Sequence, residues 1–473
     1  MKYSIGILSL MHNHHNHFQI PKEIEFILNQ INDSGHKAYI VGGALRDFVM
    51  GEKDCSDFDI ATDATPDDVM KLFPHVVPTG IKHGTVTVLT GKFKVEVTTF
   101  RTEKGYSDNR HPDSISFVGT IEEDLSRRDF TMNAMAYDHT SGTILDPYDG
   151  QKDIERKIIR CVGNPDARFA EDGLRSMRAV RFAAQLGFSL EPATQTAISN
   201  SLDAFSSVSK ERVRDEFEKL LLGKWALVGL ELLERTGLLG VIIPEMLPCR
   251  GCIQKGAHVY DVMDHCFHTV AAAPFLIDIR WAALLHDIGK PATKALGADG
   301  IPTFHNHEKV SSMLASKILE RLRLPNNDIN LIVHLIDAHM FHYTNDWSDA
   351  AVRRFIARVG VENLEPLFAL RAADSEAIVG HKVQSDNLES LRNRIELVLQ
   401  KEHAFGLKDL AINGNDVIEL GVPKGPIVGK LLSELLETVL DDPAQNNRES
   451  LLRICQGLMP KYGIIKHKSQ NEL

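Results

Sequence analysis

The stretch "YIVGGALRDFVMGEKDCSDFDIATDATPDDVMKLF", residues 39–73, alternates short apolar runs with segments of helical pattern. A glycine pair follows the first apolar run, and the segment after it reads as a helix that Gly51 closes. A second strand is expected in "DFDIAT", and Thr65 followed by Pro66 marks the start of another helix. The stretch therefore predicts the beginning of an α+β domain with a small mixed sheet.

Two further strands are expected downstream. "GTVTVLT" and "FKVEVTTF" alternate with period two on either side of Gly91, which predicts a hairpin with Glu96 and Thr98 on its polar face. After about residue 150 the strand signal fades, and helical periodicity continues to the end. The chain is thus predicted to have an α+β head followed by an extended all-α region.

Length and composition indicate an ordinary globular protein. The 473 residues suffice for two to four domains, and hydrophobic residues at 43% and charged residues at 25% are typical values. No apolar run is long enough to cross a bilayer. The opening residues lack a signal-peptide pattern, and Met11 is an alternative start of the chain. Six cysteines favour reduced thiols and a cytoplasmic location. The net charge of −11 argues weakly against a sequence-blind polyanion binder, although it leaves room for a local basic face.

The second strand carries two carboxylates, Asp57 and Asp59, that we expect on one face because they are two residues apart. Two carboxylates that close repel each other, which indicates a divalent cation between or beside them. Glu96 on the polar face of the hairpin would complete a three-carboxylate cluster. Magnesium prefers a few carboxylates together with phosphate oxygens, so the pattern suits a metal-dependent reaction on a phosphate.

The turn at Gly42 and Gly43 strengthens this interpretation. It opens a helix and offers backbone N–H groups, and Arg46 adds a positive charge where a triphosphate would lie. The two acids alone fit a second interpretation better, in which they are solvated or cap the local backbone. The combination of acids, glycines and arginine favours phosphate chemistry.

Six motifs extend the pattern from about residue 20 to residue 225: "VGGALRD", "DFDIATDA", "EVTTFR", "EEDLSRRDFTMNAMAYD", "AEDGLRSMRAVRFAAQLGF" and "SKERVRDEFEKLL". In this order they resemble the class II nucleotidyltransferases of the poly(A) polymerase and CCA-adding family. The resemblance implies a polymerase-β-like head that adds nucleotides to RNA 3′ ends with Mg²⁺ and releases pyrophosphate.

The resemblance also implies roles for individual residues. Asp57 and Asp59 correspond to the metal ligands, with Glu96 as a supporting catalytic carboxylate. The implied nucleotide-binding residues fall into a phosphate-binding element, a ribose-reading motif and a base-reading motif: Gly42, Gly43 and Arg46; Arg128, Asp129 and Asn133; and Asp172, Arg175 and Arg178.

The base-reading motif is "EDGLR". Asp172 and Arg175 are three residues apart on an expected helix and would share a face, which a surface ion pair would explain as well. In the family the matching Asp and Arg pair with the Watson–Crick edge of the incoming base. The exocyclic amine of C or A needs an acceptor and its ring nitrogen needs a donor, whereas G and U present the reverse pattern. Arg178, one turn later, is expected to orient this template or to contact phosphate.

The polar, turn-rich stretch 101–117, "RTEKGYSDNRHPDSISF", resembles the flexible loop of the family. Members that add the terminal A retain this loop, and those that add only the two C residues typically lack it. Its presence favours full CCA addition or addition of the terminal A alone.

A second group of residues resembles an HD-type metal phosphohydrolase domain. Imidazole and carboxylate together suit a second divalent transition metal that activates water on a phosphate ester. His268, His305, His334 and His342 leave the choice of ligands open, and helices that persist only as a scaffold are an alternative. The implied ligands are His265, His286, Asp287, His307, His339 and Asp374.

We therefore predict a tRNA nucleotidyltransferase that adds CCA, or its terminal A, from CTP and ATP. Its expected partners are tRNA, ATP and CTP, with neither DNA nor membrane. An A-only adding enzyme or a poly(A) polymerase is the alternative within the class, and an HD phosphohydrolase with an RNA-binding head is the alternative outside it. The expected domains are a nucleotidyltransferase head, a helical neck and body, an HD-type domain and a helical tail: 20–150, 151–250, 255–380 and 381–473.

Overall fold

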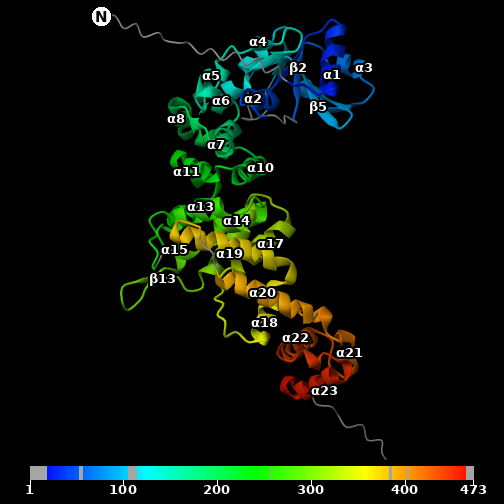
Figure 1. The fold of residues 1–473 in the computed structure, drawn as a ribbon, viewed down its shortest axis with the longest axis vertical. Coiled ribbons are helices and arrows are strands. Elements are labelled where there is room, and N and C mark those ends of the chain that lie inside the picture. The colour runs from blue at the N-terminus through cyan, green and yellow to red at the C-terminus, as the bar shows by residue number, and fades with distance from the viewer. Residues whose placement is uncertain are drawn as a thin grey trace, which may run out of the picture. The chain divides into compact units, whose positions relative to one another are not determined.

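The computed structural model describes residues 19–52, 57–104, 114–256, 258–382, 386–401 and 404–464. The chain forms two compact units, residues 1–242 and 243–473, and each is described by itself (Figure 1). Among the described residues, no helix has the length and apolar character needed to cross a membrane.

Unit 1 begins with a seven-stranded mixed sheet in the order β3-β4-β5-β2-β1-β8-β9. Only β2 and β5 run parallel, and the other neighbours are antiparallel. The predicted mixed sheet is thereby confirmed, with three strands that the sequence did not indicate, β3, β8 and β9. The strands are β1 (Ala38–Val41), β2 (Asp59–Thr62), β3 (Val76–Gly80), β4 (Thr85–Thr90), β5 (Phe93–Thr99), β8 (Ala136–Asp138) and β9 (Thr143–Leu145).

Local sequence explains the first elements. Gly91, at φ 53°, lies in the two-residue turn between β4 and β5, where a left-handed residue favours glycine. Thr65 accepts a hydrogen bond from the backbone N–H of Asp68 and so caps α3, with Pro66 at its first position. The helices around the sheet are α1 (Lys22–Asp33), α2 (Gly43–Val49), α3 (Pro66–Leu72), α4 (Ile121–Ser126) and α5 (Gly150–Glu155).

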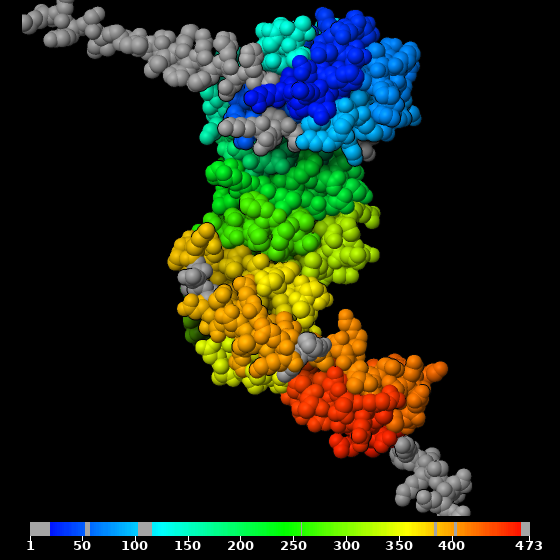
Figure 2. Space-filling view, turned by 45° about the vertical axis from the view of Figure 1, so that its right-hand side comes forward, coloured from blue at the N-terminus to red at the C-terminus, as the bar shows by residue number. Residues whose placement is uncertain are grey.

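Helices dominate the rest of unit 1. The central one, α7, is buried on most sides and packs against α10 and α11, its neighbours in Figure 1. In Figure 2 the unit extends from the dark blue to the green surface. The helices are α6 (Pro165–Glu171), α7 (Leu174–Leu186), α8 (Pro192–Asn200), α9 (Leu202–Ser206), α10 (Lys210–Leu221), α11 (Ala226–Thr236) and α12 (Leu238–Ile242).

Short strand pairs depart from the sequence-based expectation. The stretch 101–117, expected as a loop, has antiparallel strands at its two ends, β6 (Arg101–Lys104) and β7 (Ser114–Phe117). Residues 105–113 between them lie outside the described residues, as do residues 1–18 with the alternative start at Met11. A parallel pair, β10 (Ile158–Ile159) and β11 (Ser189–Leu190), also lies beyond residue 150, where no strand was expected. These pairs of two to four residues are too short to produce a clear period-two signal.

Unit 2 is helical apart from one short pair, β12 (Ala295–Leu296) and β13 (Pro302–Thr303), within its described residues. Helix α13 packs on α14 and α19, and α14 also packs on α17. The helices are α13 (Val262–Ala272), α14 (Ile277–Leu285), α15 (Lys290–Thr293), α16 (His307–Arg321), α17 (Asn326–Ala338), α18 (Asp349–Val359), α19 (Leu364–Val379) and α20 (Asp386–Lys401), followed by α21 (Gly414–Glu419), α22 (Pro426–Asp441) and α23 (Arg448–Leu458).

The last three helices share a hydrophobic core of their own, built around Val417, Leu431 and Leu451. Arg353 on α18 joins this group to the rest of unit 2, because its Nε donates to the backbone oxygen of Leu440 at 2.6 Å. That carbonyl belongs to the last turn of α22, where no helical N–H remains to satisfy it. The predicted all-α region after the head is thus confirmed in its main features.

Candidate active site and metal centre

Three carboxylates meet where β2 begins beside the middle of β5. Asp59 opens β2 and is paired in register with Glu96 of the parallel strand β5, while Asp57 lies two residues before the strand and not within it as expected. Burial raises the pKa of Asp59 to about 6; Arg128 opposes the shift, and the charges of Asp57 and Glu96 add to it. The three acids therefore repel one another, and a bound cation would relieve this repulsion.

The glycine turn brings the backbone close to this carboxylate edge. Gly42 has φ 77°, and a side chain there would place its Cβ 3.0 Å from Oδ2 of Asp59 and 3.7 Å from NH1 of Arg128. Both the backbone angle and the close approach exclude a larger residue. The turn thus keeps Asp59 and Arg128 accessible next to the start of α2.

A chain of hydrogen bonds runs from α2 to α7. Arg46 NH1 donates to Oδ1 of Asn133 at 3.1 Å, and the Asn133 amide donates to Asp129 at 3.2 Å. Arg178 on α7 completes the chain, with its Nε donating to Oδ2 of Asp129 at 2.8 Å. Burial alone would raise the pKa of Asp129, but the charge and hydrogen bonds of Arg178 lower it to about 2. Asp129 is therefore a permanent acceptor in this network.

Arg128 lies beside the chain. Its NH1 donates to the backbone oxygen of Asn133 and its NH2 to Asp124, both at 3.4 Å. The Nε atom of Arg128 is buried and has no hydrogen-bond partner among the described residues. A guanidinium with a spare donor next to Asp59 suits an anionic ligand.

Phe182 on α7 is a site residue that the sequence reasoning missed. The guanidinium groups of Arg46 and Arg178 lie over its ring, 5.3 and 5.5 Å from the centroid. Such cation–π contacts hold both side chains in place at modest energetic gain. The available signal was the spacing of four residues between Arg178 and Phe182, which places them on one helix face.

The base-reading pair is built differently from the expectation. Asp172 and Arg175 do not lie on one helix, because α6 ends at Glu171 and α7 begins at Leu174. Asp172 sits in the break with an extended backbone, φ −140° and ψ 105°, and its Oδ1 accepts from the Leu174 N–H at 3.0 Å. The short side chain of Asp competes with helical hydrogen bonding in this way, which explains the break.

Different partners hold the two side chains. Arg175 NH1 donates to Glu171 at 2.6 Å and its NH2 to the backbone oxygen of Arg127 at 3.1 Å. Asp172 instead accepts from NH2 of Arg212 on α10 at 2.8 Å. Sequence reasoning assigned no role to Glu171 or Arg212, although both stand in the motifs that carry the family resemblance.

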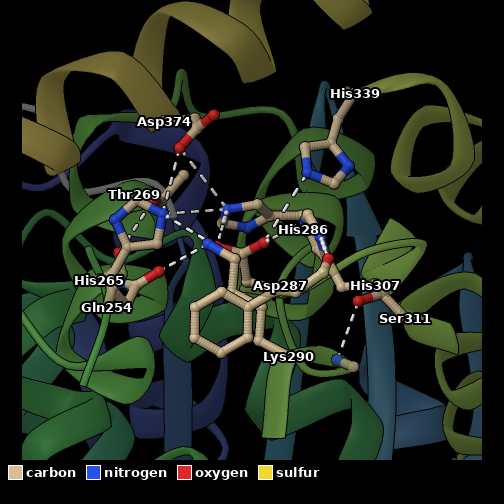
Figure 3. Close-up of polar contacts among 12 residues, drawn as sticks. Gln254, His265, Thr269, His286, Asp287, Lys290, His307, Ser311, His339 and Asp374 are labelled. Atoms are coloured by element: carbon tan, nitrogen blue, oxygen red, sulfur yellow. Dashed lines mark hydrogen bonds and ion pairs between the residues drawn. The ribbon is translucent and has the colours of Figure 1, made fainter. Parts of the chain in front are cut away.

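Unit 2 brings all six predicted HD residues into one buried cluster (Figure 3). They come from α13, the loop after α14, α16, the end of α17, and α19. His265 Nε2 lies 3.1 Å from Asp374, while the two oxygens of Asp287 face His286 at 3.2 Å and His307 at 3.1 Å. Two overlapping groups have their ligand atoms within 4.8 Å of one another: His265, His286 and Asp374; and His286, Asp287 and His339.

The histidine tautomers favour metal coordination. The Nδ1 atoms of His286, His307 and His339 lie 2.9, 2.7 and 2.6 Å from backbone oxygens, to which they donate. Each Nε2 is thereby left as the ring nitrogen that turns toward the cluster, an arrangement typical of metal-ligating histidines. Burial and the neighbouring charge of His286 lower the pKa of His339 to about 3, which keeps its ring neutral.

The other histidines considered as ligands are placed elsewhere. His268 stacks on Tyr260, and Nε2 of His334 donates to the Val359 backbone oxygen. His305 and His342 are exposed, and His305 lines a cavity of about 370 Å³ that reaches the cluster. Basic side chains border the same cavity; one of them, Lys290, lies 2.5 Å from Asp287 and donates to Gln254 at 2.6 Å.

Comparison with known protein families identifies the class. Residues 38–160 match the poly A polymerase head domain, residues 187–249 the probable RNA and SrmB-binding site of polymerase A, and residues 304–455 the putative tRNA nucleotidyltransferase domain 2. Together with the mixed sheet and its carboxylate edge, these matches define a polymerase-β-like nucleotidyltransferase. Residues 250–303, with His265, His286 and Asp287, lie outside the matched segments.

Similar proteins narrow the class further. The chain is 38% identical over 427 residues to the CCA-adding enzyme of Geobacillus thermodenitrificans, covering 90% of this chain and 94% of that one. The crystal structure of the Bacillus stearothermophilus CCA-adding enzyme in complex with CTP has a TM-score of 0.72 at 31% identity, covering 94% and 99% of the two chains. The Thermotoga maritima CCA-adding enzyme complexed with tRNA_CCA has the same fold, with a TM-score of 0.56 at 21% identity over 93% of this chain and 96% of that one.

The chain belongs to the family of CCA-adding enzymes, and it is a tRNA nucleotidyltransferase. Enzymes of this kind use a divalent metal ion. Oxygen donors are the ligands that such hard cations prefer, and the raised pKa of Asp59 marks the three acids as a donor set that gains from a cation.

Proposed function

We propose that the enzyme builds the complete CCA end of tRNA from CTP and ATP at the edge formed by β2 and β5. The observation that carries this proposal is the register of Asp59 against Glu96, with Asp57 close by and the pKa of Asp59 raised to about 6. In this proposal Asp57 and Asp59 hold Mg²⁺, and Glu96 supports them. The bound Mg²⁺ would activate the terminal RNA hydroxyl and stabilise the charge of the pyrophosphate that leaves.

The phosphates of the nucleotide are assigned to the surroundings of the glycine turn. Arg128 offers its unpaired Nε, and Gly42 and Gly43 let the phosphates approach the backbone. Arg46 adds positive charge at the start of the hydrogen-bond chain. These residues bind and orient the triphosphate so that its α-phosphorus faces the RNA end.

The ribose is assigned to Asp129 and Asn133. Asp129 stays ionised and can accept a hydrogen bond from a ribose hydroxyl. The Asn133 amide donates to the Asp129 carboxylate at 3.2 Å and so lies next to the same acceptor. Arg178 positions Asp129 through its two guanidinium contacts of 2.8 and 2.7 Å. A ligand with a 2′-hydroxyl satisfies this network better than a deoxynucleotide.

The base is assigned to Asp172 and Arg175. A carboxylate only accepts and a guanidinium only donates, which matches the amine and ring nitrogen of C and A. U and G carry a carbonyl where C and A carry the amine. Their carbonyl would face the Asp172 carboxylate, and two acceptors cannot form a hydrogen bond with each other. Separate anchoring of the two side chains by Arg212 and Glu171 keeps this pattern fixed.

The test uses three RNAs, each with one labelled triphosphate at a time. A tRNA that lacks CCA should accept C from CTP, a tRNA that ends in CC should accept a single A from ATP, and an unstructured RNA should accept neither. Addition of A alone would indicate an A-adding enzyme. A long A tail on the unstructured RNA would indicate a poly(A) polymerase, and either result would replace the proposal.

A second proposed function concerns unit 2. The six clustered side chains form a centre for a divalent transition metal, and the adjoining cavity with Lys290 would admit a phosphate ester for hydrolysis. The supporting observation is the orientation of three Nε2 atoms toward Asp287 and Asp374, fixed by Nδ1 hydrogen bonds. Assay of the purified protein with a chromogenic phosphate monoester, with and without added Mn²⁺ or Ni²⁺, tests this activity.

Two broader assignments accompany these proposals. We propose a cytoplasmic location, which agrees with the free thiols of all five cysteines in the described residues. We also keep the division into head, neck and body, HD-type domain and tail as a proposal. Limited proteolysis followed by mass spectrometry would locate the boundaries.

A further inference from the structure

Arg212 holds the side chain that is proposed to read the base. It lies in the first turn of α10, next to α7 in Figure 1, and its NH2 donates to Oδ2 of Asp172 at 2.8 Å. The other oxygen of Asp172 accepts from the Leu174 N–H at 3.0 Å. Asp172 is therefore held between two helices by one donor from each.

The NH1 and NH2 nitrogens of Arg212 differ in their hydrogen bonding. NH1 is buried and has no hydrogen-bond partner among the described residues, although NH2 of the same group is paired. A buried, charged donor without a partner is unfavourable in a folded protein and calls for an explanation. The pairing of NH2 with Asp172 is therefore the side-chain hydrogen bond through which this buried guanidinium can act.

The two base-reading residues are anchored independently. Arg175 relies on Glu171 and on the Arg127 backbone oxygen, whereas Asp172 relies on Arg212 and Leu174. Loss of Arg212 would therefore release the acceptor and leave the donor in place. A released carboxylate can rotate, so it no longer presents a fixed acceptor to the exocyclic amine of C or A.

We propose that Arg212 is a positioning residue that determines base selectivity, because it holds Asp172 in the orientation of an acceptor for the exocyclic amine of C and A. This inference rests on the proposed template role of Asp172. Arg212 acts through Asp172 on the choice of nucleotide and has no part in the transfer step itself.

The test measures kcat and KM for CTP and for UTP with tRNA that lacks CCA. Arg212→Met removes the charge and all the N–H donors at similar volume, and we expect the preference for CTP over UTP in kcat/KM to fall about ten- to hundredfold. Arg212→Lys keeps the charge without the planar fork and should give an intermediate ratio. The control is Arg214→Met on the same helix, whose side chain pairs with Asp215; it should leave the ratio unchanged.

The outcomes separate this inference from the template proposal. A folded Arg212→Met enzyme with an unchanged ratio, or with an equal loss for both nucleotides, overturns the positioning role. If Asp172→Ala changes the ratio in that case, the template proposal stands alone; if Asp172→Ala leaves it unchanged, both are wrong. Thermal unfolding followed by circular dichroism checks the fold, and Arg212→Lys carries the test if the Met variant is unfolded.

Discussion

At the scale of single residues, environment gives two carboxyl groups opposite properties. Burial, together with the charges of Asp57 and Glu96, raises the pKa of Asp59 to about 6. Burial would also raise the pKa of Asp129, but the charge and hydrogen bonds of Arg178 lower this pKa to about 2. The first group gains from a cation, and the second serves as a fixed acceptor. Sequence motifs pointed to both residues, but only the packing around them shows the difference.

Asp59→Ala should abolish nucleotide addition and leave tRNA binding intact. If Asp59 holds the catalytic metal as proposed, its removal costs about 4 kcal/mol of transition-state stabilisation, or about a thousandfold in rate. Labelled CTP incorporation and a filter-binding assay with tRNA measure the two properties. Asp63→Ala is the matched control, since Asp63 follows the same strand and pairs with His36 outside the site. Addition by Asp59→Ala within tenfold of the wild type contradicts the metal assignment.

The low pKa of Asp129 predicts that the folded protein loses stability in acid. Its pKa is about 2 in the folded protein and near 4 when unfolded, so its stabilising contribution is complete above about pH 5 and declines as the pH falls toward the folded value. Between pH 5 and pH 3 we expect a loss of about 1 kcal/mol. Hydrogen exchange of the α7 amides, corrected for intrinsic rates, should show this loss in the wild type. Asp129→Asn should lack it, and an equal loss in both proteins contradicts the prediction.

At the scale of elements, the break between α6 and α7 is the feature that the sequence did not reveal. Helical periodicity continues on both sides of Asp172, so the pattern alone favours one helix. Apart from β3, the strands and helices between residues 38 and 99 were predictable, because the period changes there from two to 3.6 and turn residues stand between them. Asp172 and Gly173 were the local signs of the break, and an Asp-Gly pair inside a helical pattern does not by itself show that the helix ends there.

Gly173→Ala should destabilise unit 1 and weaken nucleotide addition. An added Cβ would lie 2.5 Å from the backbone oxygen of Ala204 and 2.7 Å from the Phe205 nitrogen, so α9 must move. We expect a loss of about 1–3 kcal/mol in the free energy of unfolding. Thermal unfolding measures it, and Gly119→Ala, with no atom within 4 Å of its Cβ, is the control. Equal melting temperatures for the two variants would show that the break tolerates the extra atom.

At the scale of the whole molecule, the chain assembles the clustered histidines from distant segments. His265 and Asp374 are more than a hundred residues apart, yet they lie 3.1 Å from each other. Sequence resemblance indicated the six residues, but it could not separate them from the other histidines nearby. That distinction depends on the Nδ1 hydrogen bonds and on burial, which only the fold determines.

His286→Ala combined with Asp287→Ala should remove a transition metal from unit 2 and leave nucleotide addition largely intact. The reason is that His286 belongs to both overlapping ligand groups and Asp287 to one of them, whereas the three carboxylates Asp57, Asp59 and Glu96 lie in unit 1. Elemental analysis of the purified protein measures the metal, and His268→Ala is the control because it stacks on Tyr260 outside the cluster. Unchanged metal content in the double variant contradicts the proposed centre, and loss of addition would show that these residues also support unit 1.

The contacts of Arg168 and Arg175 with the end of α4 set a condition on how the RNA end grows. Arg168 NH2 donates to the Ser126 backbone oxygen at 2.7 Å and Arg175 NH2 to that of Arg127 at 3.1 Å, directly before Arg128. The residues proposed to select the base are thereby tied to the backbone next to the proposed phosphate and ribose contacts. Residues that are held in this way cannot move along the RNA as its 3′ end lengthens. If these residues select the base, each added nucleotide must be drawn away from a stationary centre before the next one enters.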